Sequence, residues 1–158
     1  MESDAAEDHA DVRILPPLLF LGSIALGVLL QLVISLRFAE SSGLRVPLGL
    51  VMIALGVAEG AWALVTMRRT RQDPDPRTPS PELIPDGPYR HTRNPMYVGM
   101  TLIQAGVGTA LGNLWILLLL VPTLFVLQRS VIEKEEAYLE RKFGTSYLRY
   151  RESVRRWL

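Results

Sequence analysis

The sequence predicts an all-α integral membrane protein with four transmembrane helices, the last two forming a helical hairpin, followed by C-terminal interfacial amphipathic helices. Two observations support this prediction. Hydrophobic residues make up 49% of the 158 residues and form long apolar runs, whereas charges crowd into the N-terminal, central and C-terminal segments. An apolar run of about 20 residues is long enough to cross the hydrocarbon core of a bilayer as a helix.

The first two apolar runs each predict one transmembrane helix. The first run covers residues 18–36 and is almost wholly apolar. Pro47 is expected to open the second helix, which extends to about Met67, because proline is tolerated in the first turn of a helix. Gly56 and Gly60 lie in this second helix at GxxxG spacing, which indicates close packing against another helix.

The third apolar run, residues 96–128, is interrupted at Gly112 and Asn113. Each half has about 16 residues, slightly short for an upright span. A single buried hydrophobic helix is the alternative, but a Gly-Asn break inside the run favours two helices that cross and return. Small residues in the first half, such as Gly99 and Gly108, would let two backbones approach closely.

The chain becomes amphipathic after Arg129. A first amphipathic helix is expected to stop at Gly144, since glycine commonly follows the end of a helix. The second apolar stripe, which arginines flank, consists of Tyr147, Tyr150, Val154 and Trp157. Aromatic and basic residues in this arrangement are typical of a helix that lies at the surface of an anionic membrane.

The distribution of arginine predicts the orientation of the chain. The central and C-terminal segments are rich in arginine, whereas the loop between the first two spans holds only Arg37 and Arg45. The positive-inside rule therefore places the central segment and the C-terminus in the cytoplasm. With four spans the N-terminus is cytoplasmic too, in a bacterial-type inner membrane or an equivalent one.

The predicted spans divide the chain into three parts. Residues 1–13 are acidic, lack the basic stretch of a signal peptide and are expected to form a disordered, solvated tail. Residues 14–67 hold the first two transmembrane helices. Residues 68–158, with the cytoplasmic loop, the hairpin and the C-terminal helices, are expected to form the catalytic, cofactor-binding region.

The composition narrows the possible chemistry. The absence of cysteine excludes disulfides, thiolate metal sites and a cysteine nucleophile. His9 and His91 are the two histidines, too few for a multi-histidine centre, so no metal is expected. No nucleic-acid partner is expected either; membrane lipids are the expected surroundings.

Residues 87–99, GPYRHTRNPMYVG, concentrate polar and aromatic side chains where a cytoplasmic loop enters the third span. Asn94 and Pro95 suit the N-cap and first turn of a helix, whose free N–H groups would attract an anion. The plainer interpretation is a well-capped helix with Tyr89 and Tyr97 in an interfacial aromatic belt. The residues by themselves favour neither interpretation.

A second polar cluster, residues 133–144, follows the fourth span. Apolar neighbours such as Leu139 would hold one of its adjacent acids, Glu135 or Glu136, toward the protein. An inward carboxylate near a membrane is costly unless it meets a cation or hydrogen-bond donors, so it marks a candidate site. For Glu136 the plainer interpretation, a solvated charge on an interfacial helix, is slightly favoured.

The two clusters together resemble the isoprenylcysteine carboxyl methyltransferase and phospholipid methyltransferase superfamily. The resemblance extends over residues 81–158 and rests on Gly87-Pro88-Tyr89-Arg90, Asn94-Pro95-Met96-Tyr97, Glu135-Glu136, Leu139, Phe143-Gly144, Tyr147 and Tyr150. It implies a membrane methyltransferase that uses S-adenosylmethionine. The cofactor pocket would lie between the cytoplasmic ends of the helices and the C-terminal helix.

The resemblance also implies roles for individual residues. The cofactor-binding residues would be Glu82, Leu83, Ile84, Tyr89, Asn94, Pro95, Met96, Tyr97 and Glu135. The candidates for catalysis would be Arg93, Asn94, Tyr97 and Glu135. The acceptor would be a hydrophobic small molecule or a lipidated molecule that is methylated on a carboxyl, amine or thiol group.

Two positions depart from the pattern of the eukaryotic carboxyl methyltransferases in this superfamily. Those enzymes commonly have histidine where this chain has Asn94, which cannot serve as a titrating base. Their substrate-binding arginine corresponds to Val131, which leaves Arg129 as the nearest candidate substrate residue. Glu59, an acid inside the second apolar run, is a further candidate because ionisable groups are rare inside membrane spans.

Two other functions are compatible with the sequence. A non-catalytic membrane scaffold would use the GxxxG helix for oligomerisation, but it would need neither of the two polar clusters. A nicotinamide-dependent membrane reductase is the other alternative, since sterol reductases resemble this C-terminal architecture; they are much longer and have more spans. Binding of S-adenosylmethionine or of NADPH distinguishes the three functions.

Overall fold

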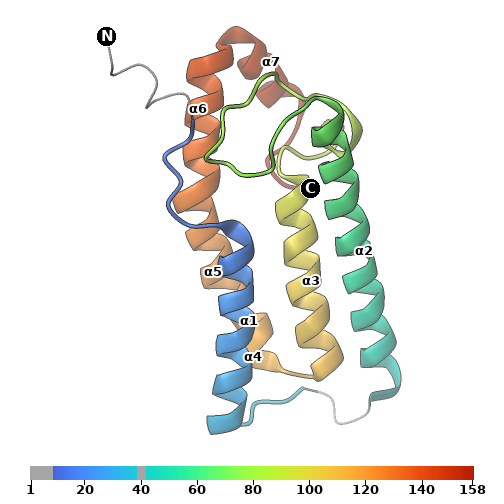
Figure 1. Ribbon diagram of the computed structural model, residues 1–158. Coiled ribbons are helices and arrows are strands. Elements are labelled where there is room, and N and C mark those ends of the chain that lie inside the picture. Colours follow the sequence, from blue (N-terminus) through green and yellow to red (C-terminus); the bar gives the residue numbers. More distant parts are fainter. Residues whose placement is uncertain (1–8, 39–41) are drawn as a thin grey trace.

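The computed structural model describes residues 9–38 and 42–158, and the regular elements in these ranges are helical. They form four long helical columns that run alternately in opposite directions (Figure 1). The elements are α1 (Pro16–Val33), α2 (Ser42–Arg69), η1 (Gly87–Arg90), α3 (Pro95–Leu111), α4 (Leu114–Leu118), α5 (Leu120–Leu127), η2 (Gln128–Ile132), α6 (Glu133–Phe143) and α7 (Thr145–Ser153).

Three of the columns are long and apolar enough to cross a membrane: Pro16–Val33, Gly43–Arg69 and Leu114–Phe143. The remaining column, α3, has 17 residues and packs along α2. The predicted break between the two legs of the hairpin is confirmed. Gly112 ends α3 with a φ of 64°, a backbone conformation that favours glycine, and Asn113 begins the returning column.

Two helix boundaries differ from the sequence-based expectations. α2 begins at Ser42, ahead of Pro47, so the prediction that Pro47 opens this helix is wrong. The additional turn is tied to α3, because Arg45 Nη1 donates a hydrogen bond to the Leu111 carbonyl at 3.2 Å. The fourth apolar leg and the first amphipathic helix form one column, joined by the π-helical turn η2.

Two pairs of glycines bring α2 and α3 into close contact. A methyl group on Gly56 would lie 2.5 Å from the Gly99 carbonyl oxygen, and one on Gly49 would lie 2.6 Å from the Gly106 carbonyl oxygen. The predicted close packing at Gly56 is therefore confirmed, and its partner is α3 of the same chain. Gly60, the other glycine of the GxxxG pair, has open space where its Cβ would lie.

Buried polar side chains join the columns away from the helix ends. Gln104 Nε2 on α3 donates hydrogen bonds to Ser23 Oγ on α1 at 2.8 Å and to the Ile116 carbonyl at 3.1 Å. Thr123 Oγ1 on α5 donates to the same Ser23 oxygen at 2.8 Å. Hydrogen bonds between helices stabilise membrane bundles because the alternative is an unpaired polar group in hydrocarbon.

Replacing Asn113 by alanine is expected to lower the free energy of unfolding by about 1–2 kcal/mol. Asn113 Oδ1 accepts from the Ile116 N–H at 3.3 Å, and Asn113 Nδ2 donates to the Gly27 carbonyl at 3.1 Å, so both bonds would be lost. Asn113→Ser keeps an N-cap acceptor without the amide donor and should recover part of the loss. Thermal unfolding in detergent checks both variants; an Asn113→Ala protein as stable as the parent would contradict the expectation.

The segment before α1 is ordered where the structure describes it. Ala10 and Val12 are buried in the same hydrophobic cluster as Tyr97 and Tyr138, and Lys134 Nζ donates to the Asp11 carbonyl at 2.6 Å. The prediction of a disordered tail up to residue 13 is therefore wrong for residues 9–13, because two small apolar side chains in the acidic stretch supply a packing surface. Residues 1–8 of that predicted tail lie outside the described residues.

Gly144 separates α6 from α7, as predicted, with a φ of 53°. Tyr147 and Tyr150 of the second apolar stripe are buried in the protein. α7 ends at Ser153, so the last two residues of the stripe do not continue the helix. Packing inside the protein thus accounts for these tyrosines, and placement of α7 at a membrane surface stays a prediction.

Candidate active site

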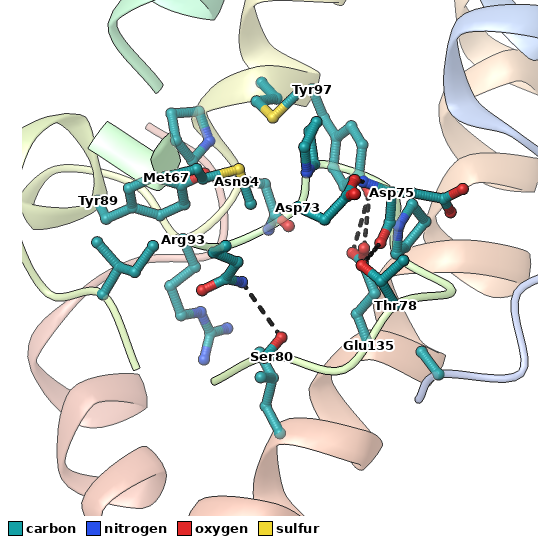
Figure 2. A pocket seen from close by; sticks show the side chains of 18 of the residues that line it. Met67, Asp73, Asp75, Thr78, Ser80, Tyr89, Arg93, Asn94, Tyr97 and Glu135 are labelled. Carbon is teal, nitrogen blue, oxygen red and sulfur yellow. Dashed lines mark hydrogen bonds between the residues drawn. The ribbon is translucent and has the colours of Figure 1, made fainter. Parts of the chain in front are cut away.

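A cavity of about 450 Å³ lies at the end of the bundle where α2 ends and where α1 and α3 begin (Figure 2). Residues 72–84 of the loop after α2, together with side chains of α6 and α7, complete its wall. In Figure 1 this loop crosses the same end of the molecule from α2 toward α6. The volume is within the range of about 300–1,000 Å³ that is typical of small-molecule sites.

The structure brings all nine residues that were predicted to bind the cofactor to this cavity. These nine residues, all in the cavity wall, are Glu82, Leu83, Ile84, Tyr89, Asn94, Pro95, Met96, Tyr97 and Glu135. Arg93, predicted as a catalytic candidate, lines the cavity as well. Residues before position 68 also contribute, among them Pro16 and Met67, so the cavity is not confined to the predicted region 68–158.

Glu135 points from α6 toward Tyr97 of α3 (Figure 2). The Tyr97 hydroxyl donates to the two Glu135 carboxylate oxygens at 2.9 and 3.0 Å. The residues that precede α6, Val131 and Ile132, are fully buried in the core. The prediction that apolar neighbours hold one of the two adjacent acids inward is therefore confirmed for Glu135.

Glu136 also points inward, and the prediction of a solvated charge is wrong. Glu136 accepts hydrogen bonds from Arg156 Nε at 3.0 Å and Nη2 at 2.6 Å, and its Oε1 lies 3.1 Å from Arg93 Nη2. The side chains of Arg93 and Glu136 are only 10% and 13% exposed. Arg156 lies 20 residues after Glu136, so helical periodicity around the glutamate did not indicate this partner.

Asn94 occupies the N-cap position of α3, as predicted, but its side chain does not cap the helix. Asn94 Nδ2 donates instead to the Arg156 carbonyl at 2.9 Å. Thr92 Oγ1 donates to the same carbonyl at 3.1 Å, and the Arg93 N–H donates to the Arg155 carbonyl at 2.9 Å. The entry to α3 is therefore fastened to the segment that follows α7.

Three tyrosines that line the cavity are neutral phenols. Burial raises the pKa of Tyr147 to about 12, and burial also raises the pKa of Tyr89 and of Tyr150 well above the ordinary value. The Tyr150 hydroxyl donates to the Tyr89 carbonyl at 2.8 Å, which joins α7 to η1. These phenols can donate hydrogen bonds at neutral pH, but they carry no charge there.

Residues 72–80 contribute to the cavity wall, although no motif in the sequence indicated it. Gln72 Nε2 donates to Ser80 Oγ at 3.2 Å, and the Ser80 N–H donates to the Tyr138 hydroxyl at 3.0 Å. Arg77 Nη2 lies 2.6 Å from Asp75, and this hydrogen bond keeps the pKa of Asp75 below its ordinary value. Side chain–backbone turns at an Asp-Pro-Asp-Pro sequence are the local signal that this loop is ordered.

Two predicted substrate residues lie outside the cavity wall. Arg129 pairs with Glu133 at 3.3 Å on the exposed side of η2 and α6. Glu59 is on α2 and does not line the cavity. Val131, which stands where arginine was expected from the eukaryotic carboxyl methyltransferases, is fully buried in the core. In residues 9–38 and 42–158, no group of three His, Cys, Asp or Glu side chains is placed to hold a metal ion.

The described residues form apolar helical columns with a ligand-sized cavity at one end, which defines a membrane-protein class with a small-molecule site. A family profile described as phospholipid methyltransferase matches residues 44–146. The chain belongs to this family, which places it among the membrane methyltransferases.

Two relatives are similar to parts of the chain. An uncharacterized protein of Haemophilus influenzae is 41% identical over 63 residues, which are 40% of this chain and 100% of the relative. The protein-S-isoprenylcysteine O-methyltransferase of Schizosaccharomyces pombe is 40% identical over 72 residues, 46% of this chain. The match spans only 30% of the length of the Schizosaccharomyces protein. No solved structure matches the chain.

Proposed function

We propose that this chain is an S-adenosylmethionine-dependent methyltransferase that acts at the cytoplasmic face of a membrane on a lipid-like or hydrophobic acceptor. The observation that carries the proposal is the convergence of nine expected cofactor residues, from the loop, η1, α3 and α6, on one cavity. Membership of the phospholipid methyltransferase family supports the reaction class.

The groups in the cavity wall fit the proposed cofactor. Arg93 has two buried donor nitrogens, Nε and Nη1, and Gln72 has a buried acceptor, Oε1, that lack partners among the described residues. An amino-acid group, which ends in a carboxylate and an ammonium, offers the matching acceptor and donors. Leu83, Ile84 and Tyr89 would contact the adenine base through apolar and aromatic surface.

The protein would contribute mainly by positioning the reactants. S-adenosylmethionine, when bound, supplies a methyl group that its sulfonium charge activates for displacement. Alignment of the reacting atoms can lower the barrier by about 7–11 kcal/mol in the best cases. Tyr97 and Glu135 support such alignment, because their mutual hydrogen bonds fix two side chains from different columns.

An apolar part of the cavity wall suits a hydrocarbon acceptor. Leu15 and Pro16 at the start of α1, Leu64 on α2 and Met100 on α3 line this part. Hydrophobic contacts with these side chains would hold an acceptor that enters from the bilayer. The carboxyl, amine and thiol classes of acceptor remain the candidates to compare.

The proposed orientation rests on the charges at the two ends of the bundle. The cavity end carries the arginines that follow α2 and those of the last two helices, whereas Arg37 and Arg45 lie at the opposite end. The positive-inside rule then places the cavity at the cytoplasmic face. In this arrangement α3 is the third of four crossings, and both termini lie on the cytoplasmic side.

The experiment that tests the proposal is methyl transfer by the purified protein in lipid vesicles. The reaction would contain S-adenosylmethionine labelled on its methyl group and, in separate vessels, phosphatidylethanolamine, a prenylated cysteine or an alkyl thiol. We expect label in the organic phase with at least one acceptor. Absence of transfer to all three classes by well-folded protein would contradict the proposal.

A further inference from the structure

Arg93, Glu136 and Arg156 form a cluster with more positive than negative charge. Glu136 is the single acid that pairs with both arginines, at 3.1 Å from Arg93 and 2.6 Å from Arg156. The nearby phenol of Tyr147 adds no negative charge at neutral pH, because burial raises its pKa to about 12. These three side chains therefore carry one more positive charge than negative charge.

The unbalanced charge is accompanied by unused hydrogen-bond donors. Arg93 lines the cavity, its side chain is 10% exposed, and its Nε and Nη1 are buried without a partner among the described residues. A guanidinium carries only donors, and a buried donor without an acceptor is costly. An anionic group in the cavity would supply both the missing acceptor and the missing negative charge.

The segment after α7, residues 154–158, holds this arrangement from outside the cavity. The carbonyl groups of Arg155 and Arg156 accept bonds from the backbone of Arg93 and from the side chains of Thr92 and Asn94. The guanidinium of Arg156 binds both oxygens of Glu136. Arg156 therefore competes with Arg93 for the single carboxylate, and Nε and Nη1 of Arg93 have no acceptor among the described residues.

We propose that Arg93 binds the carboxylate of the methionine part of the cofactor, and that Arg156 is a positioning residue that keeps Glu136 from neutralising Arg93. This inference rests on the proposed use of S-adenosylmethionine and specifies which residue binds its amino-acid end. Arg156 acts through Glu136 and does not touch the cofactor. Without Arg156, Glu136 is free to pair fully with Arg93 and to occupy the donors that the cofactor needs.

The test compares S-adenosylmethionine with decarboxylated S-adenosylmethionine, which lacks only the carboxylate. Titration calorimetry on the full chain in detergent gives the dissociation constant of each. We expect the parent protein to bind the complete cofactor about 10-fold to 100-fold more tightly, the range of a charge-assisted hydrogen bond. In Arg156→Met the ratio of the two dissociation constants should fall to about threefold or less. Affinity should be lost for S-adenosylmethionine and not for the decarboxylated compound.

Two further variants separate positioning from general stability. Arg156→Lys keeps a cation on Glu136 and should restore part of the ratio. Arg155→Met changes the neighbouring exposed side chain and keeps the backbone carbonyl, so its ratio should equal that of the parent. Thermal unfolding shows whether each variant is folded. If Arg156→Met does not fold, Arg93→Lys provides a second test of the hydrogen-bond donors of Arg93.

The outcomes distinguish this inference from the proposed function. Equal affinity of the parent protein for the two compounds would overturn the inference and leave the methyltransferase proposal standing. Binding of neither compound would overturn the proposed function itself. If the parent discriminates between the two compounds and Arg156→Met shows the same ratio, Arg156 has no positioning role. The binding role of Arg93 would then still stand.

Discussion

Alanine in place of Glu135 is expected to weaken binding of S-adenosylmethionine by about 100-fold, as loss of a hydrogen-bonded charged group costs up to about 3 kcal/mol. The substitution removes a carboxylate from the cavity wall and leaves the Tyr97 hydroxyl without its acceptor. Titration calorimetry in detergent measures the affinity. The helix itself should persist, because alanine is a good helix former.

Two variants make this prediction specific to the site. Glu133→Ala removes an acid of the same helix that pairs with Arg129 outside the cavity, and its affinity should match the parent. Tyr97→Phe keeps the carboxylate and removes its hydrogen-bond donor, so we expect a smaller loss of about 10-fold. Equal losses in Glu133→Ala and Glu135→Ala would contradict a direct role for Glu135 in binding.

Alanine in place of Gly56 is expected to lower the free energy of unfolding by about 2–3 kcal/mol, the upper part of the range for overpacking a tight interface. Its methyl group would meet the Gly99 carbonyl at 2.5 Å and Ile103 Cγ1 at 2.8 Å. Because the first contact is with backbone, α2 and α3 would have to move apart. A lower midpoint of thermal unfolding in detergent is the expected readout.

Gly60 provides the matched control for this prediction. It lies one helical turn after Gly56 in the same GxxxG pair, yet its Cβ position is open. Gly60→Ala should leave stability unchanged or raise it by up to about 1 kcal/mol, because alanine favours helix more than glycine does. If both alanines destabilise equally, the close contact at Gly56 is not what holds the two helices together.

Features that depend on neighbours in sequence could be predicted from the residues. The apolar runs, the Gly112-Asn113 break and the stop at Gly144 each follow from local backbone chemistry, and each appears in the structure. The periodicity of the apolar neighbours also predicted an inward acid at Glu135 or Glu136, and Glu135 lines the cavity. Helical spacing is a local property, so a single sequence carries it.

Features that depend on distant contacts could not be predicted. The pairing of Glu136 with Arg156, the bond from Asn94 to the Arg156 carbonyl and the packing of Ala10 on the core all join segments far apart in the sequence. Composition near each residue favoured a solvated acid, a helix cap and a disordered tail instead. Tertiary contacts overrode these local preferences.

Titration of the purified parent protein with S-adenosylmethionine and, separately, with NADPH distinguishes the proposed methyltransferase from its two alternatives. We expect saturable binding of S-adenosylmethionine to the cavity, in detergent and in lipid, and no binding of NADPH. Binding of NADPH alone would indicate a reductase. Binding of neither compound to well-folded protein would contradict the methyltransferase account and favour a non-catalytic membrane scaffold.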